Sequence, residues 1–174
     1  GLFSPDLGSE NMEEMQRQVE QLKIEAWKGY PGQPLAADGH GWWMDDEQVA
    51  YPAYEYSRRV GIKTICVHKG LPLPTWDLEH SSPRDVPKAA LDFPDMNFLI
   101  YHSGYVTGKA EGPYDPARTD GVDALVTSLL EAGVKPNSNV YAELGSTWRF
   151  VSMRDPTTAA HMMGKLFKYV GEDN

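Results

Sequence analysis

The sequence of 174 residues has very little cysteine, no long apolar run and no excess of positive charge. Its single cysteine, Cys66, excludes a disulfide within the chain, which allows a reducing compartment. No stretch approaches the roughly 18 consecutive apolar residues of a membrane helix. The formal net charge of -9 argues against nucleic acid and against an anionic membrane surface as partners. We therefore expect a cytoplasmic protein that acts on a small molecule, with a homo-oligomer left open.

Several common catalytic motifs are absent as well. The chain has no phosphate-binding glycine-rich loop, no Gly-x-Ser-x-Gly elbow, no Cys-x-x-Cys pair and no His-Glu-x-x-His helix. Its contents of 41% hydrophobic and 24% charged residues are ordinary for a soluble globular protein. The length suits one domain with a sizeable core, so we expect residues 1–174 to form a single domain.

Two short runs of apolar and β-branched residues each end on a histidine. The first covers residues 64–68 and ends at His68, and the second covers residues 97–102 and ends at His102. Such runs, bounded by turn residues, predict strands that are buried on both faces, as in a parallel sheet. The carboxyl end of a parallel strand is where open α/β sheets and α/β barrels bind ligands. We therefore take the two histidines as the centre of a candidate site.

Helical and strand patterns alternate along the chain. Amphipathic or capped segments near residues 9–22, 52–60, 85–93, 120–132 and 157–170 predict helices. The predicted strands end at Lys28, His68, His102 and Glu143, which are 34 to 41 residues apart, and residues 1–5 read as the tail of another strand. This alternation predicts a parallel sheet. Long Gly/Pro-rich loops after the strands and short ones before them favour a (β/α)8 barrel, of which the chain holds about half. We therefore expect a fragment of a barrel.

The matched positions of His68 and His102 support a functional interpretation. Neighbouring strands lie about 4.8 Å apart, so two side chains at strand ends can reach one ion or one substrate. Each histidine is then a candidate metal ligand or general base. The alternative is a pair of core histidines that bond loop carbonyls, and the repeated position of the two residues favours the functional reading.

Two charged residues at strand ends are further candidates for substrate contact. Glu143 is a carboxylate in an apolar strand, and burying it costs several kcal/mol unless it is paired. It either faces a polar barrel mouth or forms an ion pair with Lys28 or Arg149, and the sequence does not separate these. Lys28 either neutralises a substrate carboxylate or simply ends its strand. Cys66 has the parity of His68 and is expected to be inert packing.

The loops that follow the strands contribute the remaining candidates. His80 and Arg84 lie in the loop after residue 68 and are placed to contact substrate. Exposed aromatic side chains in loops usually serve a purpose, and tryptophan rings here would form an apolar lid, although they could also simply pack on each other. The three candidate lid residues are Trp42, Trp43 and Trp76.

The three segments around these residues resemble a known family. They are residues 65–70 (ICVHKG), 80–85 (HSSPRD) and 98–104 (FLIYHSG). Together they resemble the amidohydrolase-related family of metal-dependent TIM-barrel enzymes, in the branch that includes aminocarboxymuconate-semialdehyde and resorcylate decarboxylases. The resemblance runs over essentially the whole chain. It corresponds to the tail of barrel strand three through the helix after strand seven.

The resemblance implies a metal-dependent hydrolase in the full-length protein. His68 would bind a divalent metal, most often zinc, and His102 would shuttle the proton of a metal-activated water. The alternative within the family is a decarboxylase in which His102 protonates the carbon that loses carbon dioxide. The remaining family ligands lie on strands one and eight, outside this chain, so we expect the fragment alone to be inactive. A small doubly wound binding domain without catalysis is the alternative from another class.

Overall fold

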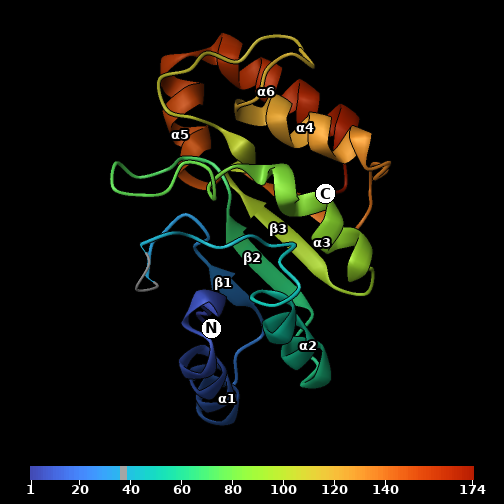
Figure 1. Ribbon diagram of the computed structural model, residues 1–174. Coiled ribbons are helices and arrows are strands. Elements are labelled where there is room, and N and C mark those ends of the chain that lie inside the picture. Colours follow the sequence, from blue (N-terminus) through green and yellow to red (C-terminus); the bar gives the residue numbers. More distant parts are fainter. Residues whose placement is uncertain (36–38) are drawn as a thin grey trace.

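The computed structural model describes residues 1–35 and 39–174 and has an α/β fold built on a four-stranded parallel sheet (Figure 1). The order in the sheet, β1-β2-β3-β4, is the order along the chain, and all three pairings are parallel. A parallel bridge between Leu2 and Lys28 continues the sheet beyond β1, so the predicted strand tail is confirmed. The strands are β1 (Trp27–Gly29), β2 (Thr64–His68), β3 (Asn97–Tyr101) and β4 (Val140–Glu143).

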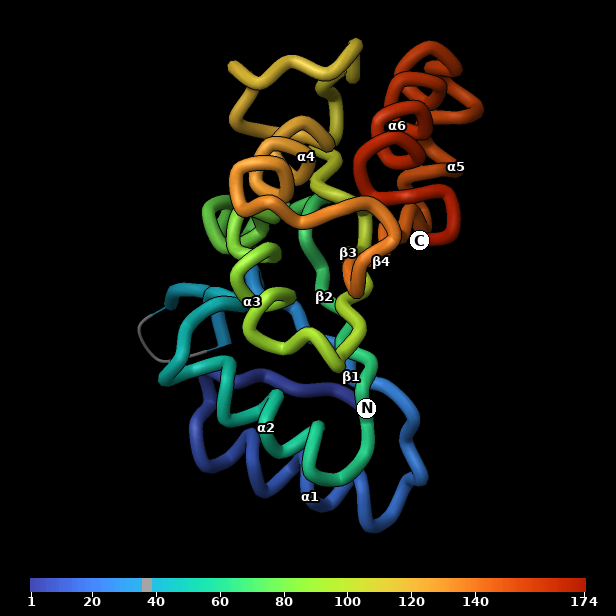
Figure 2. The backbone as a smooth tube through the Cα atoms, turned by 90° about the vertical axis from the view of Figure 1, so that its right-hand side faces the viewer, coloured from blue at the N-terminus to red at the C-terminus, as the bar shows by residue number. Residues whose placement is uncertain are grey.

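Helices alternate with these strands, as the sequence predicts. Figures 1 and 2 show α1 and α2 at one end of the molecule and α4, α5 and α6 at the other, with the strands between them. The predicted helices are confirmed to within a few residues, and α5 is an addition that the sequence patterns did not indicate. The helices are α1 (Ser9–Leu22), α2 (Tyr51–Arg59), α3 (Val86–Asp92), α4 (Gly121–Glu131), α5 (Gly145–Arg154) and α6 (Pro156–Tyr169). Short 3-10 turns cover Pro5–Leu7, Pro83–Asp85 and His102–Gly104.

One face of the sheet, which we call the outer face, is covered by helices and carries the core. Its strand residues are almost completely buried; Phe98 and Ile100, for example, have no exposed surface. The ring of Tyr54 on α2 packs edge-to-face on Phe98 with centroids 5.6 Å apart. On the same helix Ser57 accepts a hydrogen bond of 2.9 Å from the indole nitrogen of Trp27. These contacts fix the strands against the helical layer.

The opposite face, which we call the inner face, is mostly only partly buried. Successive side chains of a strand point to opposite faces, so every second residue of each strand lies here. The strand register aligns these residues in rows across the sheet, and the two rows nearest the carboxyl ends concern the site. The row at the carboxyl end is His68, Tyr101 and Glu143, and the row below it is Lys28, Cys66, Leu99 and Tyr141.

The loops confirm the predicted asymmetry, with one exception. Residues 30–50, 69–82 and 105–120 lie between a strand and the next helix or its 3-10 turn, whereas the segments before strands are short. After β4, in contrast, only Leu144 precedes α5. Residues 36–38 of the long loop after β1 fall outside the described part of the chain. The long loops therefore gather at the carboxyl ends of β1, β2 and β3, where His68 and His102 lie.

Candidate functional site

The two histidines lie against each other at the carboxyl end of the sheet. His68 is the last residue of β2, and its ring centroid is 4.4 Å from that of His102. The prediction that the two side chains share one location is therefore confirmed. The prediction that His102 ends its strand is wrong, because β3 ends at Tyr101 and His102 begins the following turn. A φ of 69° at His102 turns the chain, and an extended backbone there would direct the ring to the outer face.

The turn that carries His102 has an unfavourable backbone conformation that neighbouring loops hold in place. His102 and Ser103 both have positive φ, 69° and 48°, and each such residue costs on the order of 1–3 kcal/mol. The Ser103 hydroxyl donates to the Glu143 carbonyl at 3.1 Å, which ties the turn to β4. A Cβ atom on Gly70 would lie 2.8 Å from the Gly104 carbonyl carbon, so the loops after β2 and β3 are in backbone contact. This close contact sets the separation of the two histidines.

His68 is held by a loop carbonyl and by two aromatic rings. Its Nε2 lies 3.3 Å from the Leu71 carbonyl, and because a carbonyl only accepts, Nε2 carries the hydrogen. The lone pair of the neutral ring is then on Nδ1. Trp76 packs edge-on against His68 with ring centroids 4.6 Å apart, and Tyr30 lies 5.7 Å away. Burial lowers the pKa of His68, and the Lys28 charge acts in the same direction.

His102 is the more deeply buried of the pair and is neutral at pH 7. Burial is the main cause that lowers its pKa to about 4, and the neighbouring charges of His68 and Lys28 lower it further. Its Nδ1 lies 3.1 Å from the hydroxyl oxygen of Thr147 in the first turn of α5. A neutral imidazole offers one donor and one acceptor nitrogen, which is the form that takes up a proton.

Lys28 lies on the inner face with its amine between aromatic rings. The amine nitrogen is 3.1 Å from the ring centroid of Tyr101 and 5.4 Å from that of Tyr30. It is buried, and among the described residues it has no hydrogen-bond partner. Burial lowers the pKa of Lys28 to about 8, against the opposing effects of Cys66 and Glu143. Lys28 is therefore a buried cation near the histidine pair that forms no hydrogen bond within the described residues.

Glu143 completes the carboxyl-end row but does not form the ion pair that the sequence left open. One of its carboxylate oxygens is buried without a hydrogen-bond partner, and no ion pair joins it to Lys28 or Arg149 in the described residues. A Cβ atom on Gly145 would lie 3.1 and 3.2 Å from the two carboxylate oxygens and 3.5 Å from Cε1 of His102. Gly145 thus marks the place where Glu143, His102 and the start of α5 meet.

The other predicted contact residues form a separate cluster beside β2. The Trp43 ring lies 4.3 Å from the His80 ring and 4.1 Å from the Arg84 guanidinium. His80 donates from Nδ1 to the Asp77 carboxylate at 2.7 Å, and its carbonyl accepts a 2.8 Å bond from Lys69. Three of the predicted residues are therefore neighbours of one another, and their described contacts do not include the histidine pair.

The expected tryptophan lid is found only in part. Trp42 is 3% exposed and packs on Phe3 with ring centroids 5.5 Å apart, so it belongs to the core and not to a lid. Trp43 stacks in the His80 cluster. Trp76 alone contacts the histidine pair, through His68. The three rings were grouped because all lie in loops, but in the folded chain they pack in three different places.

Three residues of the site were not foreseen from the sequence. Tyr101 is paired with His68 and Glu143 in the sheet register. The alternation of side chains along β3 predicts this position once the last residue of the strand is known. Tyr30 follows β1 directly and packs on His68. Thr147 lies on the unpredicted α5, and nothing in its sequence surroundings marked it. Tyr101 and Tyr30 can be found from their places along the strands, whereas Thr147 can be found only from the three-dimensional structure.

The residues present do not on their own form the metal site that the family resemblance implies. A catalytic zinc site takes three protein ligands and keeps one open position. Within residues 1–35 and 39–174, no group of three His, Cys, Asp or Glu side chains is arranged to hold an ion. His68 would offer Nδ1 as one ligand, since its Nε2 bonds a carbonyl. The chemistry proposed below therefore uses only the residues of this chain.

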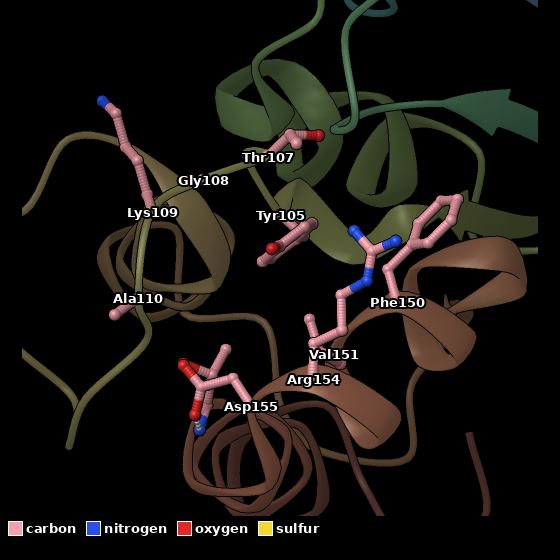
Figure 3. Close-up of a pocket in the computed structure, with 10 residues that line it drawn as sticks. Tyr105, Thr107, Gly108, Lys109, Ala110, Phe150, Val151, Arg154 and Asp155 are labelled. Atoms are coloured by element: carbon pink, nitrogen blue, oxygen red, sulfur yellow. Dashed lines mark hydrogen bonds between the residues drawn. The ribbon is translucent and has the colours of Figure 1, made fainter.

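A pocket of about 500 Å³ lies next to α5 on the side of the loop that follows β3. Figure 3 shows the Arg154 side chain rising between Tyr105 and Phe150, with Lys109 across the opening. Neither His68 nor His102 lines this pocket, so the pocket and the polar strand ends are different places. We base the candidate site on the strand ends because their polar groups converge.

Comparisons with known proteins identify the fold and nothing finer. No family model matches the chain, and no curated protein matches its sequence. Among solved structures it is similar to the uncharacterised TIM-barrel protein Bb4693 from Bordetella bronchiseptica, with a TM-score of 0.52 and 16% identity. The match covers 99% of this chain and 60% of that one, so the chain spans about three fifths of the barrel protein's length. The parallel sheet and this likeness place the chain among α/β folds of the TIM-barrel type.

No helix in the described residues is long and apolar enough to cross a membrane.

Proposed function

We propose that this chain is part of a (β/α)8-barrel hydrolase whose active site lies at the carboxyl ends of β2, β3 and β4. In this assignment Leu2 belongs to barrel strand three, and β1 to β4 are strands four to seven. The contact of the His68 and His102 rings, 4.4 Å apart at neighbouring strand ends, is the observation that carries the proposal. The partly buried inner face supports it, because a closed barrel covers that face with its other strands.

His102 is the residue we assign to proton transfer. Because its ring is neutral at pH 7, it accepts a proton from a water molecule as the water oxygen attacks the scissile carbonyl carbon of an ester or amide. The bond to the leaving group then breaks, and the imidazolium returns the proton to that group. The neighbouring Lys28 cation disfavours the charged ring, so the proton is passed on and not retained.

His68 and Glu143 border the same position and would contact the substrate or an ion. In the family that the sequence resembles, a divalent metal, usually zinc, would sit beside His68 with ligands from strands outside this chain. Decarboxylation is the alternative reaction, and there His102 would protonate a carbon instead of a leaving group. Hydrolysis begins from the neutral ring, whereas protonation of a carbon needs the imidazolium, so the lowered pKa of His102 supports hydrolysis over decarboxylation.

The test compares the intact barrel protein with its His102→Asn and His161→Asn variants on small 4-nitrophenyl esters and anilides. His161 is the matched control because it lies on α6. We expect His102→Asn to lower the rate by about 10²–10⁴-fold, the usual contribution of a general acid–base, and His161→Asn to change nothing. Unchanged turnover in His102→Asn would refute the proposal. If the wild type releases carbon dioxide from aromatic carboxylic acids and His102→Asn does not, the assigned reaction becomes decarboxylation.

A further inference from the structure

Thr147 lies in the first turn of α5, and its side chain reaches back to the histidine pair. The residue has no exposed surface, and its hydroxyl oxygen is 3.1 Å from Nδ1 of His102. The two residues are 45 positions apart in the sequence, so only the fold brings them together. A fully buried hydroxyl needs a hydrogen-bond partner, and here the ring of His102 provides it.

The turn before Thr147 brings a second acceptor to the same ring. The Leu144 carbonyl accepts a 2.9 Å bond from the Thr147 amide, and this backbone group raises the pKa of His102 against the effect of burial. Gly145, with a φ of 46°, closes this turn so tightly that a Cβ atom there would approach His102 Cε1 to 3.5 Å. The start of α5 therefore presents a hydroxyl and a carbonyl to His102, and a carbonyl can only accept.

We propose that Thr147 is a positioning residue that fixes the tautomer of His102, with the hydrogen on Nδ1 and the lone pair on Nε2. In a neutral imidazole one nitrogen carries the hydrogen, and the hydrogen bond made by one nitrogen decides the role of the other. With Nδ1–H directed at α5, Nε2 is the nitrogen left to exchange a proton. This role for Thr147 in turnover rests on the proposed function, whereas the tautomer itself does not.

The direct test is nitrogen-15 NMR of the histidine rings in the wild type and in Thr147→Val and Thr147→Ser. Valine keeps the shape of threonine without the hydroxyl, and serine keeps the hydroxyl. We expect wild type and Thr147→Ser to show one tautomer of His102 with Nδ1 protonated, and Thr147→Val to show a mixture. A hydrogen on Nε2 in the wild type would overturn the proposal, as would an unchanged tautomer in Thr147→Val.

Two controls keep this test decisive. Thr127→Val removes a hydroxyl that lies 3.1 Å from the Tyr114 hydroxyl, and it should leave the His102 signals unchanged. If Thr147→Val does not fold, the wild-type spectrum alone still decides which nitrogen carries the hydrogen. In the active barrel protein Thr147→Val should lower kcat while KM stays constant, with rescue by Thr147→Ser. Full activity in His102→Asn would refute the proposed function and leave the tautomer assignment standing.

Discussion

The outer and inner faces of the sheet are built from the same strands but have opposite character. On the outer face alternate residues such as Ile65, Phe98 and Ile100 are completely buried under helices. On the inner face the neighbouring residues are mostly half-buried, and they include His68, Glu143 and an unpaired lysine. The outer face thus stabilises the fold, whereas the inner face carries polar groups that the fold does not need.

Two lysines show the difference most clearly. Lys69 follows β2, has no exposed surface, and its amine is 2.6 Å from the Asp85 carboxylate and 2.8 Å from the His80 carbonyl. The Lys28 amine on the inner face is also buried, but it has no hydrogen-bond partner among the described residues and lies against the rings of Tyr101 and Tyr30. The first lysine is part of a buried network of hydrogen bonds. The second is available for a role outside the folded core.

Replacing these lysines should give the largest contrast in stability. Lys69→Met leaves the Asp85 carboxylate buried without its partner, which typically costs about 3–5 kcal/mol. Lys28→Met removes an unpaired buried amine, so the free energy of unfolding should stay within about 1 kcal/mol of the wild type or rise. Urea denaturation of both variants measures this. If both variants lose the same free energy of unfolding, Lys28 has a structural partner and the two lysines do not differ in role.

Two adjacent residues of β3 test the comparison on apolar side chains. Ile100 points to the outer face and Leu99 to the inner face, and the two side chains are of equal size. Ile100→Ala should lower the free energy of unfolding by about 2–5 kcal/mol because it leaves a cavity in a packed core. Leu99→Ala should cost roughly 1 kcal/mol, since its side chain is only partly buried. A larger loss for Leu99→Ala than for Ile100→Ala would contradict the assignment of the faces.

The buried histidine predicts how stability depends on pH. The folded pKa of His102, about 4, lies below the ordinary histidine value of 6.5, so the unfolded chain binds more protons between these values. Stability is therefore fully present above pH 6.5 and is lost as the pH falls towards 4. His102→Asn should make the curve flatter in this window. Melting curves from pH 4 to 8 measure it, and a wild-type curve with no slope there would argue against a neutral buried ring.

Zinc should have the smallest effect. His68 and His102 provide at most two ligands, and the described residues contain no third one in place. We expect micromolar zinc chloride to leave the melting temperature of the 174-residue chain unchanged and to be lost on gel filtration. Stoichiometric zinc that is retained, and lost in His68→Ala, would show that the inner face completes a metal site without further strands.

Much of the fold could be predicted from the sequence because it follows from local patterns. Apolar runs and caps gave the strands, five of the helices and the parallel order, and the position of His68 followed directly. Helix α5 was missed because it contains aromatic and β-branched residues such as Trp148, Phe150 and Val151, which indicate no helix. Only Thr147 and Val151 of this helix are buried, so it lacks a clear apolar stripe.

The site was less predictable because its contacts join distant segments. The positive φ at His102 is unusual for a residue other than glycine, and the sequence does not indicate it. Contact of Thr147 with His102 and of Lys69 with Asp85 depends on how the loops and helices pack. Trp42 was assigned to a lid from its place in a loop, but the loop folds its ring onto Phe3. Residue type and spacing predicted the location of the site, whereas its hydrogen bonds required the fold.

The central claim is that the inner face holds a neutral histidine pair in close contact. Proton NMR titration of the histidine ring signals tests it most directly, with His102→Asn used to assign the His102 signal. We predict that His102 stays neutral at pH 6 and titrates near pH 4, because burial and the charges of His68 and Lys28 oppose its protonation. A His102 signal that titrates at or above pH 6.5 would show an exposed or ion-paired ring and would contradict the account.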